Sequence, residues 1–263
     1  MKGPAGIMAL VLAETAAGGA GFLFLTPLWG EVRRGFFYLT GGIVLALAVS
    51  AAGAAAGAYD AATASKGRVA VTLALVLAGA TLVWLGLVRS RLHLAGRVLG
   101  IATVPLAVAM LLAFARTTDE SLALSFFQLL AGAVFTGAVL DGLLLGHWYL
   151  TDRRLTRGPI NRMAWLLIAS VVLETAAVIA GAIGAPSRPG RAASTLNPLL
   201  TVAGSATWIA IGMVACTGLI AVFIRITLRG TRPTAVQSAT GFFYLAVITS
   251  FTAELAAKVR FLP

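Results

Sequence analysis

The sequence predicts an all-α integral membrane protein, a bundle of about eight transmembrane helices joined by short loops. Three observations predict this class: 59% of the 263 residues are hydrophobic, only 11% are charged, and the mean hydropathy is +0.95. A soluble domain carries about 25% charged residues. Because no stretch is polar enough to cover a soluble domain, we expect residues 1–263 to form a single polytopic membrane domain.

A helix that crosses the bilayer needs about 20 apolar residues, since about 30 Å of hydrocarbon is crossed at about 1.5 Å per residue. With charge clusters and Pro or Gly breaks taken as boundaries, eight segments qualify: 5–29, 35–58, 69–88, 98–115, 122–150, 163–185, 199–224 and 239–257. The first is too long for a cleavable signal peptide and has Glu14 in its middle. Backbone groups find no water in lipid, so each segment is expected to be helical.

The lysines and arginines at the ends of these segments predict an orientation. One face carries twelve: Arg33, Arg34, Arg89, Arg91, Arg97, Arg153, Arg154, Arg157, Arg162, Arg225, Arg229 and Arg232. The other carries eight: Lys2, Lys66, Arg68, Arg116, Arg188, Arg191, Lys258 and Arg260. The positive-inside rule therefore predicts a multi-pass protein of the cell membrane, with the arginine-rich loops in the cytoplasm and both termini outside. The net charge of +11 is scattered over short loops, which favours contact with the lipid bilayer and not with nucleic acid.

Four acidic residues fall inside the predicted spans and are the first candidates for a functional site: Glu14, Asp141, Glu174 and Glu254. A charge at the bilayer centre costs about 2.5–3.5 kcal/mol, so such residues usually face a partner or a wet cavity. The four carboxyls are predicted to lie at different depths in the membrane. A proton relay across the membrane requires such a spread of depths. We therefore interpret them as candidates for proton or quinone handling.

A structural role is the alternative for each carboxyl, which would then be protonated and bonded to a neighbouring helix. Glu254 has Lys258 four residues later on the same helical face, the favourable order for an ion pair. Asp141 is close enough in sequence to Arg153 and Arg154 for an interfacial pair. No cation lies within a helical turn of Glu14 or Glu174, which makes these two the strongest candidates.

Only two histidines occur, His93 and His147, and both fall on the predicted cytoplasmic side. Placement on one side permits them to ligate a haem b or to contact a quinone. The alternative is that His93 belongs to an arginine-rich connection and His147 to an interfacial aromatic belt. The lone Cys216 offers no disulfide framework or thiolate metal site, and we predict no metal.

Small residues and short internal matches suggest how the helices pack. The run Ala16–Gly21 is expected to let helix backbones approach closely. Residues 14–17 match 174–177, and residues 35–39 match 241–245, but the first pair relates antiparallel spans and the second relates parallel ones. One duplication cannot produce both. An inverted repeat would favour a secondary transporter with its site at the midplane.

The segment Ala13–Leu23, followed by a short arginine loop and a second small-residue helix, resembles the opening of the polysulfide-reductase type of membrane quinol subunit. That family is also similar in its number of helices, its short loops and an acidic residue in a mid-chain helix, here Glu174. The resemblance implies a quinone pocket near one membrane surface, with acidic residues that take up or release its protons.

The leading expectation is a membrane-embedded subunit of an electron-transfer complex that anchors membrane or peripheral redox subunits and handles quinone, protons or both. No independent catalytic motif occurs, because no serine or cysteine is placed with a histidine that could activate it. One alternative is a proton-coupled secondary transporter of a small solute or ion. Another is a purely structural membrane subunit.

Overall fold

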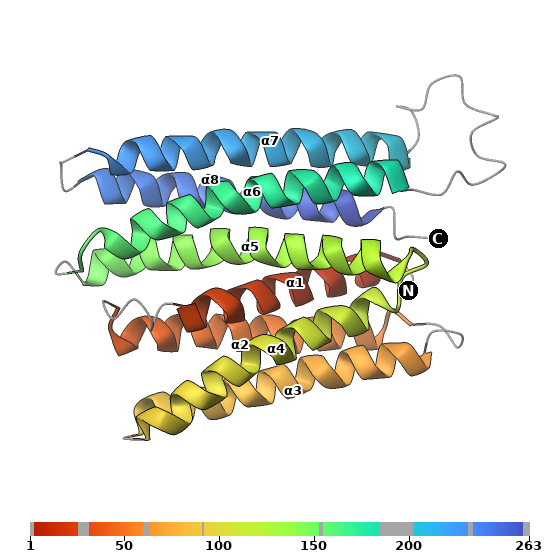
Figure 1. Cartoon of the computed structure of the whole chain (residues 1–263), viewed down its shortest axis with the longest axis horizontal. Coiled ribbons are helices and arrows are strands. Elements are labelled where there is room, and N and C mark those ends of the chain that lie inside the picture. Colours follow the sequence, from red (N-terminus) through yellow and green to blue (C-terminus); the bar gives the residue numbers. More distant parts are fainter. Residues whose placement is uncertain are drawn as a thin grey trace.

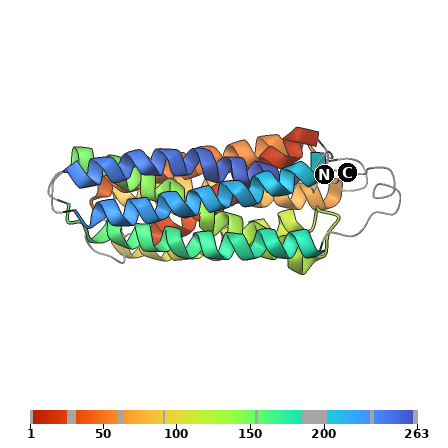
Figure 2. The ribbon, with the colours of Figure 1, turned by 90° about the horizontal axis from the view of Figure 1, so that it is seen from above.

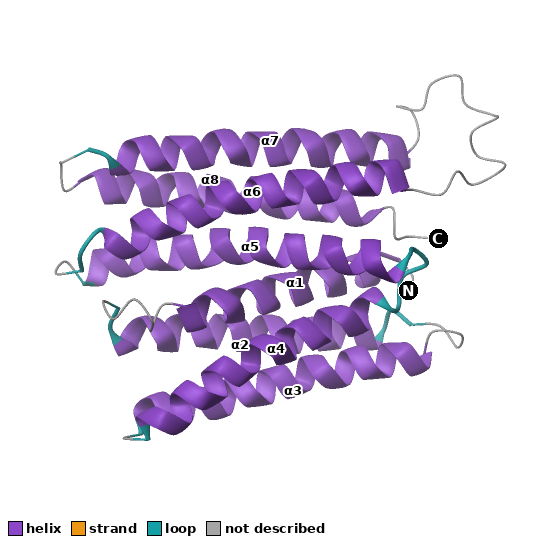
Figure 3. Ribbon diagram, in the orientation of Figure 1, coloured by secondary structure: helices purple, strands orange, loops and turns teal. Residues whose placement is uncertain are grey.

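The computed structural model describes residues 3–25, 32–59, 64–90, 92–152, 155–184, 202–230 and 234–259. These residues form eight helices and no strand (Figure 3). The helices are α1 (Gly3–Leu25), α2 (Arg34–Ala56), α3 (Ala64–Arg89), α4 (His93–Ala115), α5 (Leu122–Thr151), α6 (Gly158–Gly184), α7 (Val202–Leu228) and α8 (Thr234–Lys258). Each is long and apolar enough to cross a membrane, which confirms the predicted fold class.

Several helices are longer than predicted at the end that carries arginines. α6 begins at Gly158 and includes Arg162, whereas the prediction began at 163, and α7 continues past Arg225 to Leu228. The prediction ended helices at charge clusters, but a helix continues through the headgroup region when its cationic side chains reach water. Pro159 is compatible with the start of α6 because the first-turn N–H groups have no intrahelical acceptor. The predicted limits at 29, 185 and 199 lie outside the described residues.

The eight helices divide into two groups of four, α1–α4 and α5–α8, that meet along α1 and α5 (Figure 1). Within each group, every helix packs against the next and the fourth helix contacts the first. Across the boundary the contact is mainly between α1 and α5. These two helices are accordingly the most enclosed, since 83% and 78% of their apolar stretches are buried against 28% to 44% for the others.

Small residues explain why α1 and α5 form the centre. A Cβ added to Gly18 would lie 1.8 Å from the carbonyl oxygen of Ala133, and one added to Gly137 would lie 2.5 Å from the carbonyl carbon of Gly18. The two backbones are therefore in direct contact, which only glycine permits at these positions. The close packing predicted from Ala16–Gly21 is confirmed.

The connections alternate between the two ends of the bundle, so α1 and α5 run in the same direction (Figure 1). The start of α1 and the end of α8 lie at one end, as a second view also shows (Figure 2). Helices that occupy corresponding places in the two groups are α1 and α5, α2 and α6, α3 and α7, and α4 and α8. The short sequence matches pair α1 with α6 and α2 with α8, so they do not follow this arrangement.

Candidate functional site

Four buried ionisable side chains meet where the two groups of helices join. Glu14 comes from α1, Glu174 from α6, and Glu254 and Lys258 from α8. The Lys258 ammonium nitrogen lies 2.8 Å from Glu14 Oε1 and 2.9 Å from Glu254 Oε2. All four side chains belong to residues that are at most 2% exposed. We call these four residues the carboxylate–lysine cluster.

Glu174 completes the carboxylate–lysine cluster from the α6 side. Its carboxyl lies near enough to Lys258, Glu14 and Glu254 to interact electrostatically with all three. Two carboxyl groups share a hydrogen bond only when one of them carries a proton, because an ionised carboxylate has no donor. The arrangement therefore suits a site that holds protons.

The backbone of α5 forms one wall of the cluster at Gly132. A Cβ added there would lie 2.7 Å from Glu14 Oε1 and 2.9 Å from Glu254 Oε2. A residue with a side chain would occupy the space that the two carboxylates use. Gly132 is therefore a part of the site, although it contributes no functional group.

The direction of the Lys258 side chain follows from its place at the end of α8. In an α-helix the Cα–Cβ bond tilts toward the N-terminus, so a side chain in the last turn leans back along the helix. For Lys258 this is toward the interior of the bundle, whereas a lysine at a membrane interface commonly reaches outward to water. The ion pairs with Glu14 and Glu254 hold the ammonium group inward.

The charges of the carboxylate–lysine cluster do not balance when every group is ionised. Three carboxylates around one ammonium carry a net charge of −2, and an uncompensated charge in the membrane interior is costly. The cluster becomes neutral when it takes up two protons. Within the described part of the chain, Glu14 Oε2, Glu174 Oε2 and Glu254 Oε1 have no hydrogen-bond partner, so oxygen atoms remain to accept them.

Gln128 extends the polar region from the cluster toward the end of the bundle where α1 begins and α8 ends. It lies one turn before Gly132 on α5, and its Nε2 donates to the carbonyl oxygen of Ala177 on α6 at 3.5 Å. Its Oε1 has no partner among the described residues. Gln128 and Gly132 were not predicted as site residues, and Lys258 was predicted only as the ion-pair partner of Glu254, which the structure confirms. Gln128 carried a signal as an amide inside an apolar span, whereas nothing in the sequence connected Lys258 to Glu14.

Asp141 stands apart from the other three predicted carboxyls. It lies on α5 about 13 Å along the helix axis from Gly132. It is 3% exposed, and neither oxygen has a hydrogen-bond partner in the described ranges. The arginines predicted to pair with it, Arg153 and Arg154, lie outside the described residues. Three of the four carboxyls thus converge on one site and are not spaced across the membrane.

The two histidines do not join the cluster. The side chain of His147 is exposed in the last turns of α5. His93 begins α4, and its side chain lies outside the described part of the structure. Their suggested roles toward haem b or quinone stay predictions. No three histidine, cysteine, aspartate or glutamate side chains of the described residues are grouped so that they could hold a metal ion.

Comparisons of the chain with protein-family models, with curated proteins and with solved structures found no match. The resemblance of Ala13–Leu23 to quinol subunits therefore stays a prediction, and so do the redox subunits expected as partners.

Proposed function

We propose that this multi-pass membrane protein is a proton-coupled secondary transporter of a small solute or ion, and that the carboxylate–lysine cluster binds the coupling proton. One observation carries the proposal: Lys258 of the second group of helices is ion-paired with Glu14 of the first, in a cluster that holds more carboxyls than cations. The experiment is designed to distinguish this transporter from the electron-transfer subunit that the resemblance implies.

The position of the cluster supports a transport role. Transporters built from two halves commonly place substrate and coupling-ion sites near the membrane midplane, where the halves meet, and expose them to each side in turn by rocking one half against the other. Here Glu14 is the middle of α1, and its carboxyl lies against α5 and α8 of the other group. A change of charge at this point acts directly on the boundary between the two groups.

Protonation supplies the difference in free energy that such a motion requires. An ionised Glu14 attracts Lys258 and holds α1 to α8, whereas a protonated Glu14 loses most of that attraction. A ligand shifts a conformational equilibrium only by its difference in affinity for the two states. A proton on Glu14 meets this condition because it favours the state in which the ion pair is open.

The test uses the purified chain alone in liposomes that contain a trapped pH-sensitive dye. Gradients of Na⁺, K⁺, lactate and alanine are imposed one at a time, and the movement of protons is followed from the dye signal. We expect at least one gradient to drive protons in the wild type and not in Glu14→Gln. The Gly53→Ala variant is the matched control, because a Cβ at Gly53 meets no atom within 4 Å.

The alternatives predict a different result. An electron-transfer subunit or a purely structural subunit would leave the vesicles inert to every gradient, because each needs partner proteins for its activity. Inert vesicles, together with quinone turnover that is restored when a co-purified redox subunit is added, would contradict the transporter proposal.

A further inference from the structure

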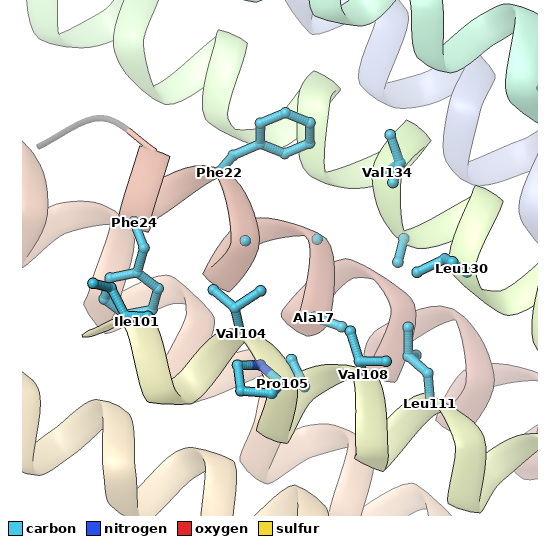
Figure 4. A pocket seen from close by; sticks show the side chains of 14 residues that line it. Ala17, Phe22, Phe24, Ile101, Val104, Pro105, Val108, Leu111, Leu130 and Val134 are labelled. Atoms are coloured by element: carbon cyan, nitrogen blue, oxygen red, sulfur yellow. The ribbon is translucent and has the colours of Figure 1, made fainter. Parts of the chain in front are cut away.

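A pocket of about 470 Å³ lies between α1, α4 and α5, and all the side chains around it are apolar (Figure 4). Its walls include Gly21 and Phe22 of α1, Val104 and Val108 of α4, and Val134 of α5. The volume is in the range of pockets that bind small molecules, which is about 300–1,000 Å³. The pocket belongs neither to the carboxylate–lysine cluster nor to the proposed transport step.

The pocket exists because α4 leaves α5 uncovered. α4 packs closely on α3 and on α1 but makes little contact with α5. Gly18 and Gly21 place no side chain in the space that results, and a Cβ at Gly21 would meet no atom within 4 Å. Pro105 also lines the pocket and removes one backbone donor from α4.

The pocket is open to the lipid-facing surface of α4. Ile101 and Val108 line it and are 67% and 37% exposed. Water is disfavoured in a cavity without polar groups, and an empty cavity loses dispersion contacts along its walls. The pocket therefore suits an apolar chain from the bilayer.

The extent of the pocket along α4 fits one chain of a membrane lipid. Its lining residues on this helix run from Ile101 to Leu111, which is about 15 Å of rise. This equals the hydrocarbon depth of one leaflet, half of about 30 Å. An acyl chain that enters near Ile101 would pass Val104 at the middle of α4 and end near Leu111, four residues before the end of the helix.

The cationic side chain of Arg97 lies on α4 near the position where the headgroup of that lipid would lie. Arg97 is exposed, and it precedes Ile101 by one turn on the helical face that also carries Val104 and Val108. It lies toward the end of α4 that the positive-inside rule places in the cytoplasm, where anionic lipids are enriched. A guanidinium group binds phosphate oxygens with two parallel hydrogen bonds.

We propose that this pocket binds one anionic phospholipid, with an acyl chain between α1, α4 and α5 and its phosphate at Arg97. A quinone ring is a poorer occupant, because none of the side chains that line the pocket can donate a hydrogen bond to its carbonyl oxygens. The inference does not depend on the transport proposal.

The test uses the full chain in nanodiscs that contain phosphatidylglycerol with a photoreactive group near the end of its acyl chain. Mass spectrometry of the labelled protein locates the adducts. We expect Val108 and Leu111, at the end of the pocket away from Arg97, to be labelled well above Leu82, which is exposed on α3 outside the pocket. Labelling spread evenly over exposed residues of α3 and α4 would overturn the proposal, and so would stronger competition by a quinone than by unlabelled phosphatidylglycerol.

Two variants examine the two parts of the site. Gly21→Phe fills the pocket, and Gly86→Phe is its control, because a Cβ at Gly86 also meets no atom within 4 Å and Gly86 is exposed on α3. We expect labelling of Val108 to be lost in the first and kept in the second. Arg97→Gln should abolish the preference for phosphatidylglycerol over phosphatidylcholine. Equal labelling in both phenylalanine variants, or an unchanged lipid preference in Arg97→Gln, would contradict the assignment.

Discussion

Lys258 holds the carboxyl groups of Glu14 and Glu254 together at the centre of the cluster. Its ammonium group forms ion pairs with two buried carboxyls, those of Glu14 and Glu254, at the same time. Removing one partner of a buried ion pair costs about 3–5 kcal/mol, because the other charge is left without compensation. The energetic importance of the cluster is therefore concentrated in a single side chain.

We expect Lys258→Met to lower the free energy of unfolding by about 3–5 kcal/mol near neutral pH. Without the ammonium group the carboxyls must hold additional protons in the folded state, and the unfolded chain gives these up as the pH rises. Because the folded state then binds more protons, stability falls with rising pH, more steeply than in the wild type. Thermal unfolding in detergent across a pH series measures this.

The double variant Lys258→Met/Glu14→Gln is the control for Lys258→Met. It removes both charges, so it should recover part of the loss, with an interaction free energy of about 0.5–3 kcal/mol between the two sites. Glu14→Gln alone completes the comparison. If the loss of stability in the double variant equals the sum of the losses in the two single variants, Lys258 and Glu14 are not coupled.

Gly132→Ala tests the space that the carboxylates occupy. The added Cβ would come within 3 Å of Glu14 Oε1 and Glu254 Oε2, so the carboxyls must move away from Lys258. We expect a loss of about 1–3 kcal/mol, the usual cost of overpacking, and loss of the infrared signal of any carboxyl that shares a proton. Gly79→Ala, where a Cβ meets nothing within 4 Å, should gain about 0.5–1 kcal/mol from helix propensity instead. A Gly132→Ala protein as stable as Gly79→Ala would contradict this account of the wall.

At the scale of the helices, the contact between α1 and α5 holds the molecule together. The two backbones touch at Gly18, Ala133 and Gly137. In lipid, helix association depends on such packing, because lipid chains are as apolar as the side chains and there is no hydrophobic gain. This contact also sets the position of Glu14, one turn before Gly18 on the same face of α1.

Gly18→Ala should separate α1 from α5. Its Cβ would meet a backbone carbonyl, which cannot rotate away as a side chain can. We expect a loss of stability of at least about 1–3 kcal/mol, with reduced proton uptake because Glu14 moves with α1. Gly42→Ala on α2 is the control, since its Cβ meets no atom within 4 Å. The measurement is thermal unfolding of both variants, and equal midpoints would argue against direct backbone contact.

At the scale of the whole molecule, two groups of four helices lie side by side, with the start of α1 and the end of α8 at one face (Figures 1 and 2). The structure gives the relative direction of the helices. The side of the membrane on which the termini lie remains a prediction from the arginine-rich loops.

We expect a fluorescent protein that matures only in the cytoplasm to stay dark when fused after Pro263 and to fluoresce when fused after Ser90, at the end of α3. A periplasmic phosphatase fused at the same two positions should give the reverse pattern. The reason is that Ser90 follows α3 at the arginine-rich face, opposite to the termini. Fluorescence at Pro263 and phosphatase activity at Ser90 would show that the orientation is inverted.

Hydropathy was sufficient to predict the helices because each span must satisfy its own backbone, and length and composition then identify it. The sequence also singled out Glu14, Glu174 and Glu254, since a charge in a span is rare. It could not show that these three meet, because the contacts join helices that are far apart in the chain. Gly132 carried no signal at all, since its role is the space that it leaves.

Glu14 and its partner Lys258 are far apart in the chain. Glu14 enters the membrane with α1, whereas Lys258 enters with α8, after the six helices between them have been synthesised. Until α8 is inserted, the carboxyl on α1 must remain protonated or find another contact. A chain that stops before α8 would keep a carboxyl without its lysine inside the bilayer, a feature by which membrane quality control can distinguish such a molecule from one that contains both helices.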